Sequence, residues 1–119
     1  MESEKFEGFA NFETFCVYSW LANERGTNRY WRRQARKQLK RAPDSAQVKE
    51  GTWTKAAAAK FNLADQLERE LNEAAPIGML DMYTELMMAG LDRVEWAELA
   101  ETFLADMGQA TPTSKEGAR

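Results

Sequence analysis

The sequence predicts an all-α fold, a compact bundle of about five helices. Apolar residues recur at spacings of three and four along most of the chain, and no stretch shows the alternation typical of strands. Cap and breaker residues (Asn, Thr, Asp, Gly and Pro) separate these stretches. At 119 residues and 44% hydrophobic content, the chain has room for one core. We expect an arm over 1–10, a single helical domain over 11–107 and a disordered tail over 108–119.

The first helix is expected to run from Asn11, as N-cap, to about Asn23. Its apolar residues cover much of its circumference, which predicts a central helix with a core set of Phe12, Phe15, Cys16 and Trp20. Cys16 is the only cysteine, so we expect a buried apolar side chain and no internal disulfide. Gly26 is expected to end this helix in a left-handed conformation, and Asn28 to cap the next one.

The second helix, over about 29–42, is amphipathic. Trp31 is its expected core anchor, with Ala35, Leu39 and Ala42 on the same side. Pro43 ends this helix, and residues 43–52 are expected to form an extended linker.

Three further helices complete the predicted bundle. The third spans about 55–74, is capped by Thr52 or Thr54, and carries a core stripe of Phe61, Ala64, Leu67 and Leu71. The fourth spans about 77–90 and ends at Gly90. Its methionines are expected to pack in the core, with an adaptable partner surface as the alternative: Met79, Met82, Met87 and Met88. A capping box at Asp92 starts the fifth, which runs to about Met107 and buries Trp96, Leu99, Ala100, Phe103 and Leu104.

Charge is strongly segregated along the chain. Residues 25–41 contain eight Arg or Lys and no acid, and the whole chain has a net charge of −3, so the rest sums to −11. At about 100° per residue, six of these charges fall on one side of the second helix: Arg29, Arg32, Arg33, Arg36, Lys37 and Lys40. A one-signed face attracts an oppositely charged partner, so we expect these residues, with Tyr30 as the one stacking candidate, to form a binding surface. The alternative is a solvated or intramolecularly neutralised face.

Residues 61–107 form an acidic counterpart, with 11 acids and two arginines. Such a surface could mimic a nucleic-acid backbone, but solubility is the simpler explanation. Glu70 with Glu73, and Glu98 with Glu101, have the spacing of carboxylate pairs, but that spacing is common in helices.

Several classes of function are disfavoured. The chain has no histidine, which removes Ser-His-Asp and Cys-His catalysis and His-containing metal sites. We find no glycine-rich phosphate loop and no metal-spaced cluster, and therefore expect no enzyme activity, no metal and no cofactor. No apolar run approaches a membrane span and the N-terminus lacks the pattern of a signal peptide, so we expect a cytoplasmic protein.

The opening segment 11–24 carries a resemblance. Asn11, Phe12, Glu13, Thr14 and Phe15, followed by Trp20-Leu21 and Asn23-Glu24, resemble the start of a family of small uncharacterised proteins of bacteria, plasmids and phages. The similarity continues at Tyr30-Trp31-Arg32, at 63–67 and at 91–101, with Phe15 where the family usually has Trp. The resemblance implies a mobile-element setting and transfers no activity.

Three hypotheses of function follow. The first is a non-enzymatic mobile-element protein that binds and inhibits a host defence complex, such as a CRISPR effector, through the basic helix. The second is a nucleic-acid-binding accessory protein that places the same helix on phosphates. The third is a structural or assembly protein, for which a stable homo-oligomer with a buried methionine face is expected.

Overall fold

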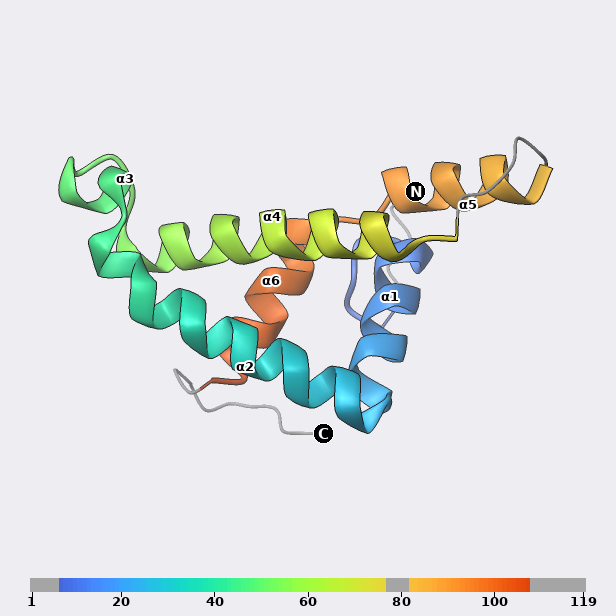
Figure 1. The fold of residues 1–119 in the computed structure, drawn as a ribbon, viewed down its shortest axis with the longest axis horizontal. Helices are drawn as coiled ribbons and strands as arrows, with labels where there is room; N and C mark the ends of the chain where they lie inside the picture. The colour runs from blue at the N-terminus through green and yellow to red at the C-terminus, as the bar shows by residue number, and fades with distance from the viewer. Residues whose placement is uncertain (1–6, 77–81, 108–119) are drawn as a thin grey trace.

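The computed structural model describes residues 7–76 and 82–107 (Figure 1). Within these residues the chain forms six α-helices, one 3₁₀ helix and no strand, which confirms the predicted all-α bundle. The helices are α1 (Phe12–Asn23), α2 (Arg25–Arg41), η1 (Ala42–Asp44), α3 (Ala46–Lys49), α4 (Lys55–Ala74), α5 (Met82–Asp92) and α6 (Trp96–Ala105). No helix of this described part is long and apolar enough to cross a membrane.

Helices α2, α4 and α6 build the core. In Figure 1, α2 and α4 lie close together at the end near α3 and diverge toward α1, while α6 packs against both of them. The buried apolar side chains come mainly from these three helices, and Leu21 of α1 joins them: Trp31, Ala35, Leu63, Ala64, Leu67, Leu99, Ala100 and Phe103. Trp31 is only 3% exposed, so its predicted role as the anchor of α2 is confirmed.

Alanines allow α2 and α4 to meet closely at the narrow end. Ala58 and Ala59 are completely buried against Ala42, in a second small cluster that Leu39 and Trp53 border. Side chains this small let two helix backbones approach one another. Ala58 and Ala59 therefore let the end of α2 lie close to α4.

The start of α1 is tied to the connection between α5 and α6. Asn11 caps α1, because its Oδ1 accepts from the Thr14 backbone N–H at 2.9 Å, and its Nδ2 donates to the Arg93 carbonyl at 2.8 Å. The fully buried Thr14 hydroxyl donates to Asn11 Oδ1 and accepts from the Glu95 N–H at 2.9 Å. Glu13 pairs with the Arg93 guanidinium at 3.3 Å. The polar residues of the opening motif thus hold residues 93–95 in place.

Helix α2 begins four residues earlier than predicted. Gly26 lies in its first turn and does not adopt a positive φ, so the predicted left-handed cap is wrong, as is the cap at Asn28. The N-cap is Glu24, whose carboxylate accepts from the Thr27 N–H at 2.8 Å and the Thr27 hydroxyl at 2.7 Å. These bonds lower the pKa of Glu24. One residue therefore separates α1 from α2.

Other predicted boundaries are partly wrong. The predicted linker contains η1 and α3, because Pro43 can open a 3₁₀ turn and the Ser45 side chain caps α3. The predicted capping box at Asp92 does not form, because α5 continues past Gly90 to Asp92, and α6 starts at Trp96. The third predicted helix matches α4, with Thr54 as its cap. The start of the fourth predicted helix, Met79, residues 1–6 of the arm and the predicted tail lie outside the described residues.

Some predicted core residues are exposed. Trp20 is 73% exposed and Phe12 is 51% exposed, because α1 lies at the edge of the bundle and buries only the side carrying Thr14 and Leu21. Its apolar residues surround the helix, so periodicity could not identify the buried side. Cys16 is half-buried. Phe61 is also partly exposed, against Trp53.

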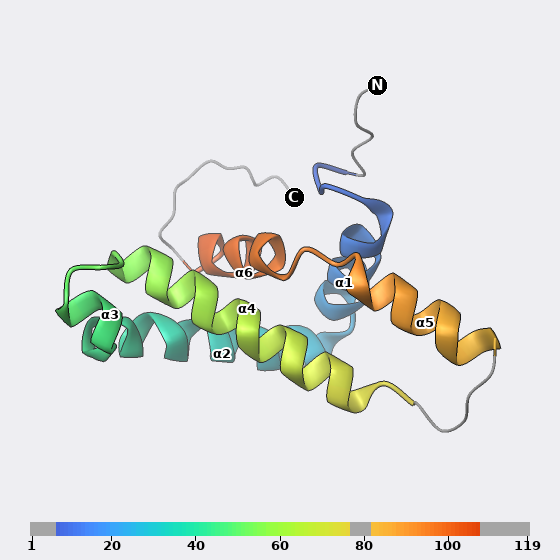
Figure 2. The same ribbon diagram turned by 90° about the horizontal axis from the view of Figure 1, so that it is seen from above.

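Helix α5 projects from the end of the bundle beyond α1, as Figures 1 and 2 both show. Of its residues only Thr84 is buried. Met82 and Met88 are exposed and Met87 is half-buried, so the expectation that the methionines pack in the core is wrong for the two exposed ones.

Candidate docking surface on the basic helix

The basic side chains of α2 lie on the side of the helix that faces away from the core. Trp31 and Ala35 are buried on the inner side. We call five exposed cations on the outer side, between Arg29 and Lys40, the basic face: Arg29, Arg33, Arg36, Lys37 and Lys40. At about 100° per residue these five occupy a sector of roughly 100°. Figure 1 shows α2 along one edge of the molecule, and all five side chains are exposed.

The basic face is not neutralised within the part of the chain that the structure describes. Its five cations form no ion pair with a described acid. Arg32, predicted as a sixth member, lies at the border instead and pairs with Asp106 of α6 at 3.6 Å. Both side chains are more than a third exposed, so the pair contributes at most about 1 kcal/mol to stability.

The cations of the basic face repel one another along the helix. Arg29 and Arg33, Arg33 and Lys37, and Arg36 and Lys40 are each four residues apart. Like charges at this spacing destabilise a helix by about 0.2–0.5 kcal/mol per pair. Like charges that destabilise a helix, with no acidic side chain nearby to offset the repulsion, are typical of a surface that serves binding.

Tyr30 is not a free stacking platform. Its hydroxyl donates to Glu70 Oε1 at 2.8 Å, and its ring packs edge-on against Trp31 at 5.1 Å between centroids. The hydrogen bond to Glu70 raises the pKa of the Tyr30 phenol, and burial adds to the shift. The tyrosine therefore links α2 to α4, while its remaining surface, 37% exposed, borders the basic face.

A chain of polar side chains continues from Tyr30 along the contact between α2 and α4; we call it the polar seam. Gln66 donates to Glu70 Oε2 and to Gln34 Oε1, both at 2.9 Å, and accepts from Gln38 Nε2 at 3.1 Å. Gln34 and Gln66 are almost fully buried. Hydrogen bonding between such buried amides fixes the register of the two helices. The sequence held a signal for the seam, because Tyr30, Gln34 and Gln38 are each four residues apart, but we did not predict it.

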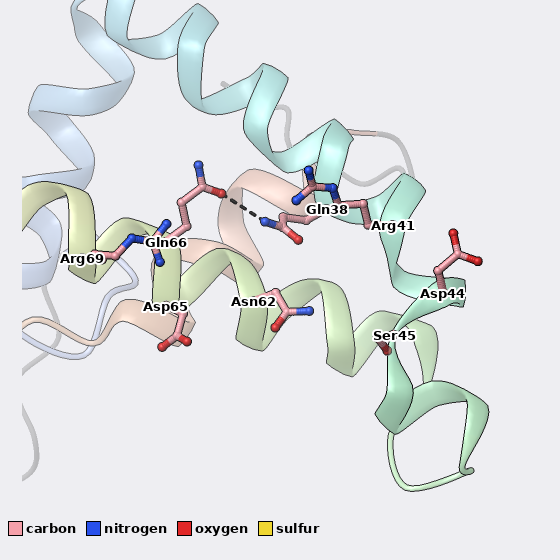
Figure 3. A pocket seen from close by; sticks show the side chains of 8 residues that line it. All are labelled: Gln38, Arg41, Asp44, Ser45, Asn62, Asp65, Gln66 and Arg69. Atoms are coloured by element: carbon pink, nitrogen blue, oxygen red, sulfur yellow. Dashed lines mark hydrogen bonds between the residues drawn. The ribbon is translucent and has the colours of Figure 1, made fainter.

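An open cleft of about 500 Å³ lies beside the polar seam (Figure 3). Its walls come from α2, α4 and the turn between η1 and α3, and its lining residues include Gln38, Arg41, Asp44, Asn62, Asp65 and Arg69. Arg41 and Arg69 have no ion-pair partner among the described residues. Arg41 and Arg69 extend the positive surface from the basic face into the cleft. Asp44 and Asp65 place negative charge in the same cleft.

Three of the four glutamates with the spacing of carboxylate pairs have structural partners. Glu98 Oε1 accepts from the Ala10 N–H at 3.0 Å, and Glu70 belongs to the polar seam. Glu101 lies 3.5 Å from Lys60. Across the described ranges, no group of three or more Cys, Asp or Glu side chains could hold a metal ion.

Comparison with known proteins gives no assignment. No family model, curated protein or solved structure matches this chain. The resemblance at 11–24 and the use of the basic face therefore stay predictions.

Proposed function

We propose that this chain is a non-enzymatic binding protein that docks the basic face of α2 on an acidic surface of a partner protein. The observation that carries the proposal is that five exposed cations on one helix side lack an acidic partner among the described residues. An acidic surface of matching size would neutralise these charges and relieve their mutual repulsion.

Two features favour a protein over a long nucleic acid. The basic face extends from Arg29 to Lys40, about 17 Å at 1.5 Å per residue. A longer duplex would pass beyond it, and the chain outside residues 25–41 has a net charge of −11, which disfavours a polyanion. In addition, the side chain of Tyr30 is already held by Glu70 and Trp31.

The setting we propose is inhibition of a host defence complex, such as a CRISPR effector, by a mobile-element protein. The opening motif at 11–24 supports this setting through its resemblance to proteins of plasmids and phages. The basic face would then bind an acidic surface of the complex and hinder its action on invading nucleic acid.

Phage plating tests this setting. Expression of the protein in cells with active CRISPR immunity should raise the plating efficiency of a targeted phage, and a tagged copy should retain the effector complex. The double variant Arg33→Glu with Lys37→Glu should lose both effects. The matched control is Lys49→Glu with Lys55→Glu, which changes the net charge equally on exposed residues outside the basic face. Unchanged plating together with no retained defence component would refute the proposed setting.

A nucleic-acid-binding accessory protein is the second candidate, favoured by Arg41 and Arg69 in the cleft beside the basic face. Binding of a 20-base-pair duplex through the five cations would give a log–log salt slope of about −4.5. A flat salt dependence, or no binding at low salt, argues against this candidate.

A further inference from the structure

Helix α5 presents an uncharged outer stripe that no other described helix covers. Met82 is 60% exposed and Leu86 is 62% exposed, and Ala89 and Gly90 lie on the same side about one turn beyond Leu86. Tyr83, 74% exposed, borders the stripe. An exposed run of large apolar residues on one helix side is typical of an interaction surface.

The order of large and small residues in the stripe makes it complementary to itself. Met82 and Tyr83 lie in the first half of α5, whereas Ala89 and Gly90 lie in the second half, with Leu86 between them. Two antiparallel copies centred on Leu86 would bring Met82 opposite Gly90 and Tyr83 opposite Ala89. A Cβ added at Gly90 would meet no atom within 4 Å, so the space above Gly90 is open to such a side chain.

We propose that two copies of the chain associate through antiparallel packing of their α5 helices, with Leu86 at the two-fold axis. Antiparallel pairing places Met82 and Tyr83 opposite the small residues Gly90 and Ala89 of the second copy, while the two Leu86 side chains meet at the axis. The second copy is the occupant that this stripe fits best, because it supplies the same pattern in reverse. The proposal is independent of the basic face, which lies on α2.

The size of the stripe indicates a weak dimer. The exposed parts of these five residues amount to on the order of 400 Å² per copy, about half of the ~800 Å² that each partner buries in a standard interface.

Sedimentation velocity over a concentration series from about 5 to about 500 µM tests the dimer. The wild-type protein should shift from monomer to dimer across this range. Leu86→Lys should remain monomeric, because it places two like charges at the axis. Trp20→Lys is the matched control, since it changes a large exposed side chain on another helix and should dimerise like the wild type.

Gly90→Met tests the interface without destabilising the fold. Methionine raises the helix propensity at this position and its Cβ meets no atom within 4 Å, so the variant should melt at the same temperature as the wild type or higher. It should nevertheless be monomeric, because its new side chain would clash with Met82 of the second copy. Adding Met82→Ala to Gly90→Met should restore the dimer, because large and small positions are then exchanged.

Three results would each overturn the proposal. The first is a wild-type protein that stays monomeric up to the highest concentration. The second is a Gly90→Met variant that dimerises as well as the wild type. The third is equal loss of the dimer in Leu86→Lys and Trp20→Lys.

Discussion

Thr14 shows how a single side chain joins two distant parts of the chain. It is fully buried, and its hydroxyl connects the cap of α1 with the backbone that enters α6, 81 residues later. Together with Asn11 and Glu13 it holds residues 93–95. The two segments of the resemblance, 11–24 and 91–101, thus meet in the structure. The polar residues of the opening motif stabilise the fold, whereas the basic face is the surface that we propose binds a partner.

Replacing Thr14 with valine tests this account. Thr14→Val keeps the shape of the side chain but leaves the Glu95 N–H without its partner and removes one of the two hydrogen bonds that Asn11 Oδ1 accepts. We expect the free energy of unfolding to fall by about 1–3 kcal/mol in urea denaturation. Thr102→Val is the control, because the Thr102 hydroxyl only bonds the Glu98 carbonyl four residues earlier in α6. A loss in Thr14→Val no larger than in the control would contradict the role of Thr14.

Tyr30 predicts a pH dependence of stability. Because its pKa is raised in the folded state, folding is stabilised below the ordinary tyrosine pKa of about 10, and this contribution is lost as pH rises through the folded value. Tyr30→Phe should lower the free energy of unfolding at pH 7 by about 0.5–1 kcal/mol. The difference in the free energy of unfolding between wild type and Tyr30→Phe should become smaller above about pH 10. Tyr83→Phe, on the exposed tyrosine of α5, is the control; a constant Tyr30→Phe difference up to pH 11 would contradict the assignment.

At the scale of elements, the sequence predicted the bounds of a helix well where one cap residue and one breaker residue mark its two ends. The bounds of α4 follow from Thr54 and the residues before Pro76. The start of α2 could not be predicted in this way, because the Glu24 carboxylate replaces the usual Ser, Thr, Asn or Asp cap and Gly26 can be helical. The buried sides of α1 and α5 were also missed, because apolar residues surround both helices.

Repulsion among the cations of the basic face should make α2 less stable than a helix with mixed charges at the same positions. Arg33 lies near Arg29, Arg36 and Lys37 at spacings of three and four residues. Arg33→Glu turns these repulsions into attractions and should raise the free energy of unfolding by about 1 kcal/mol, with Arg33→Gln in between. Thermal unfolding at low ionic strength, where the effect is largest, measures the change. If Arg33→Glu destabilises the protein, the result would indicate that these cations stabilise the fold and would contradict the proposal that they serve binding.

At the scale of the whole molecule, the sequence predicted most residues of the basic face but not the contacts around it. The cations were placed on one helix side by their spacing alone, and five of them lie on the basic face. The polar seam, the cleft with Arg41 and Arg69, and the pairing of Arg32 with Asp106 depend on how α2 meets α4 and α6. Spacing along one helix cannot show such contacts, because they join residues up to 74 positions apart.

The most direct test is a comparison of partner binding by three proteins in a salt series. Wild type, Arg33→Glu with Lys37→Glu, and the control Lys49→Glu with Lys55→Glu are measured by surface plasmon resonance against the captured defence complex. The account predicts that reversal on the basic face weakens binding at least about tenfold at low salt, that the gap narrows as salt rises, and that the control binds like wild type. Equal affinity of all three proteins, or equal loss in both variants, would contradict docking through the basic face.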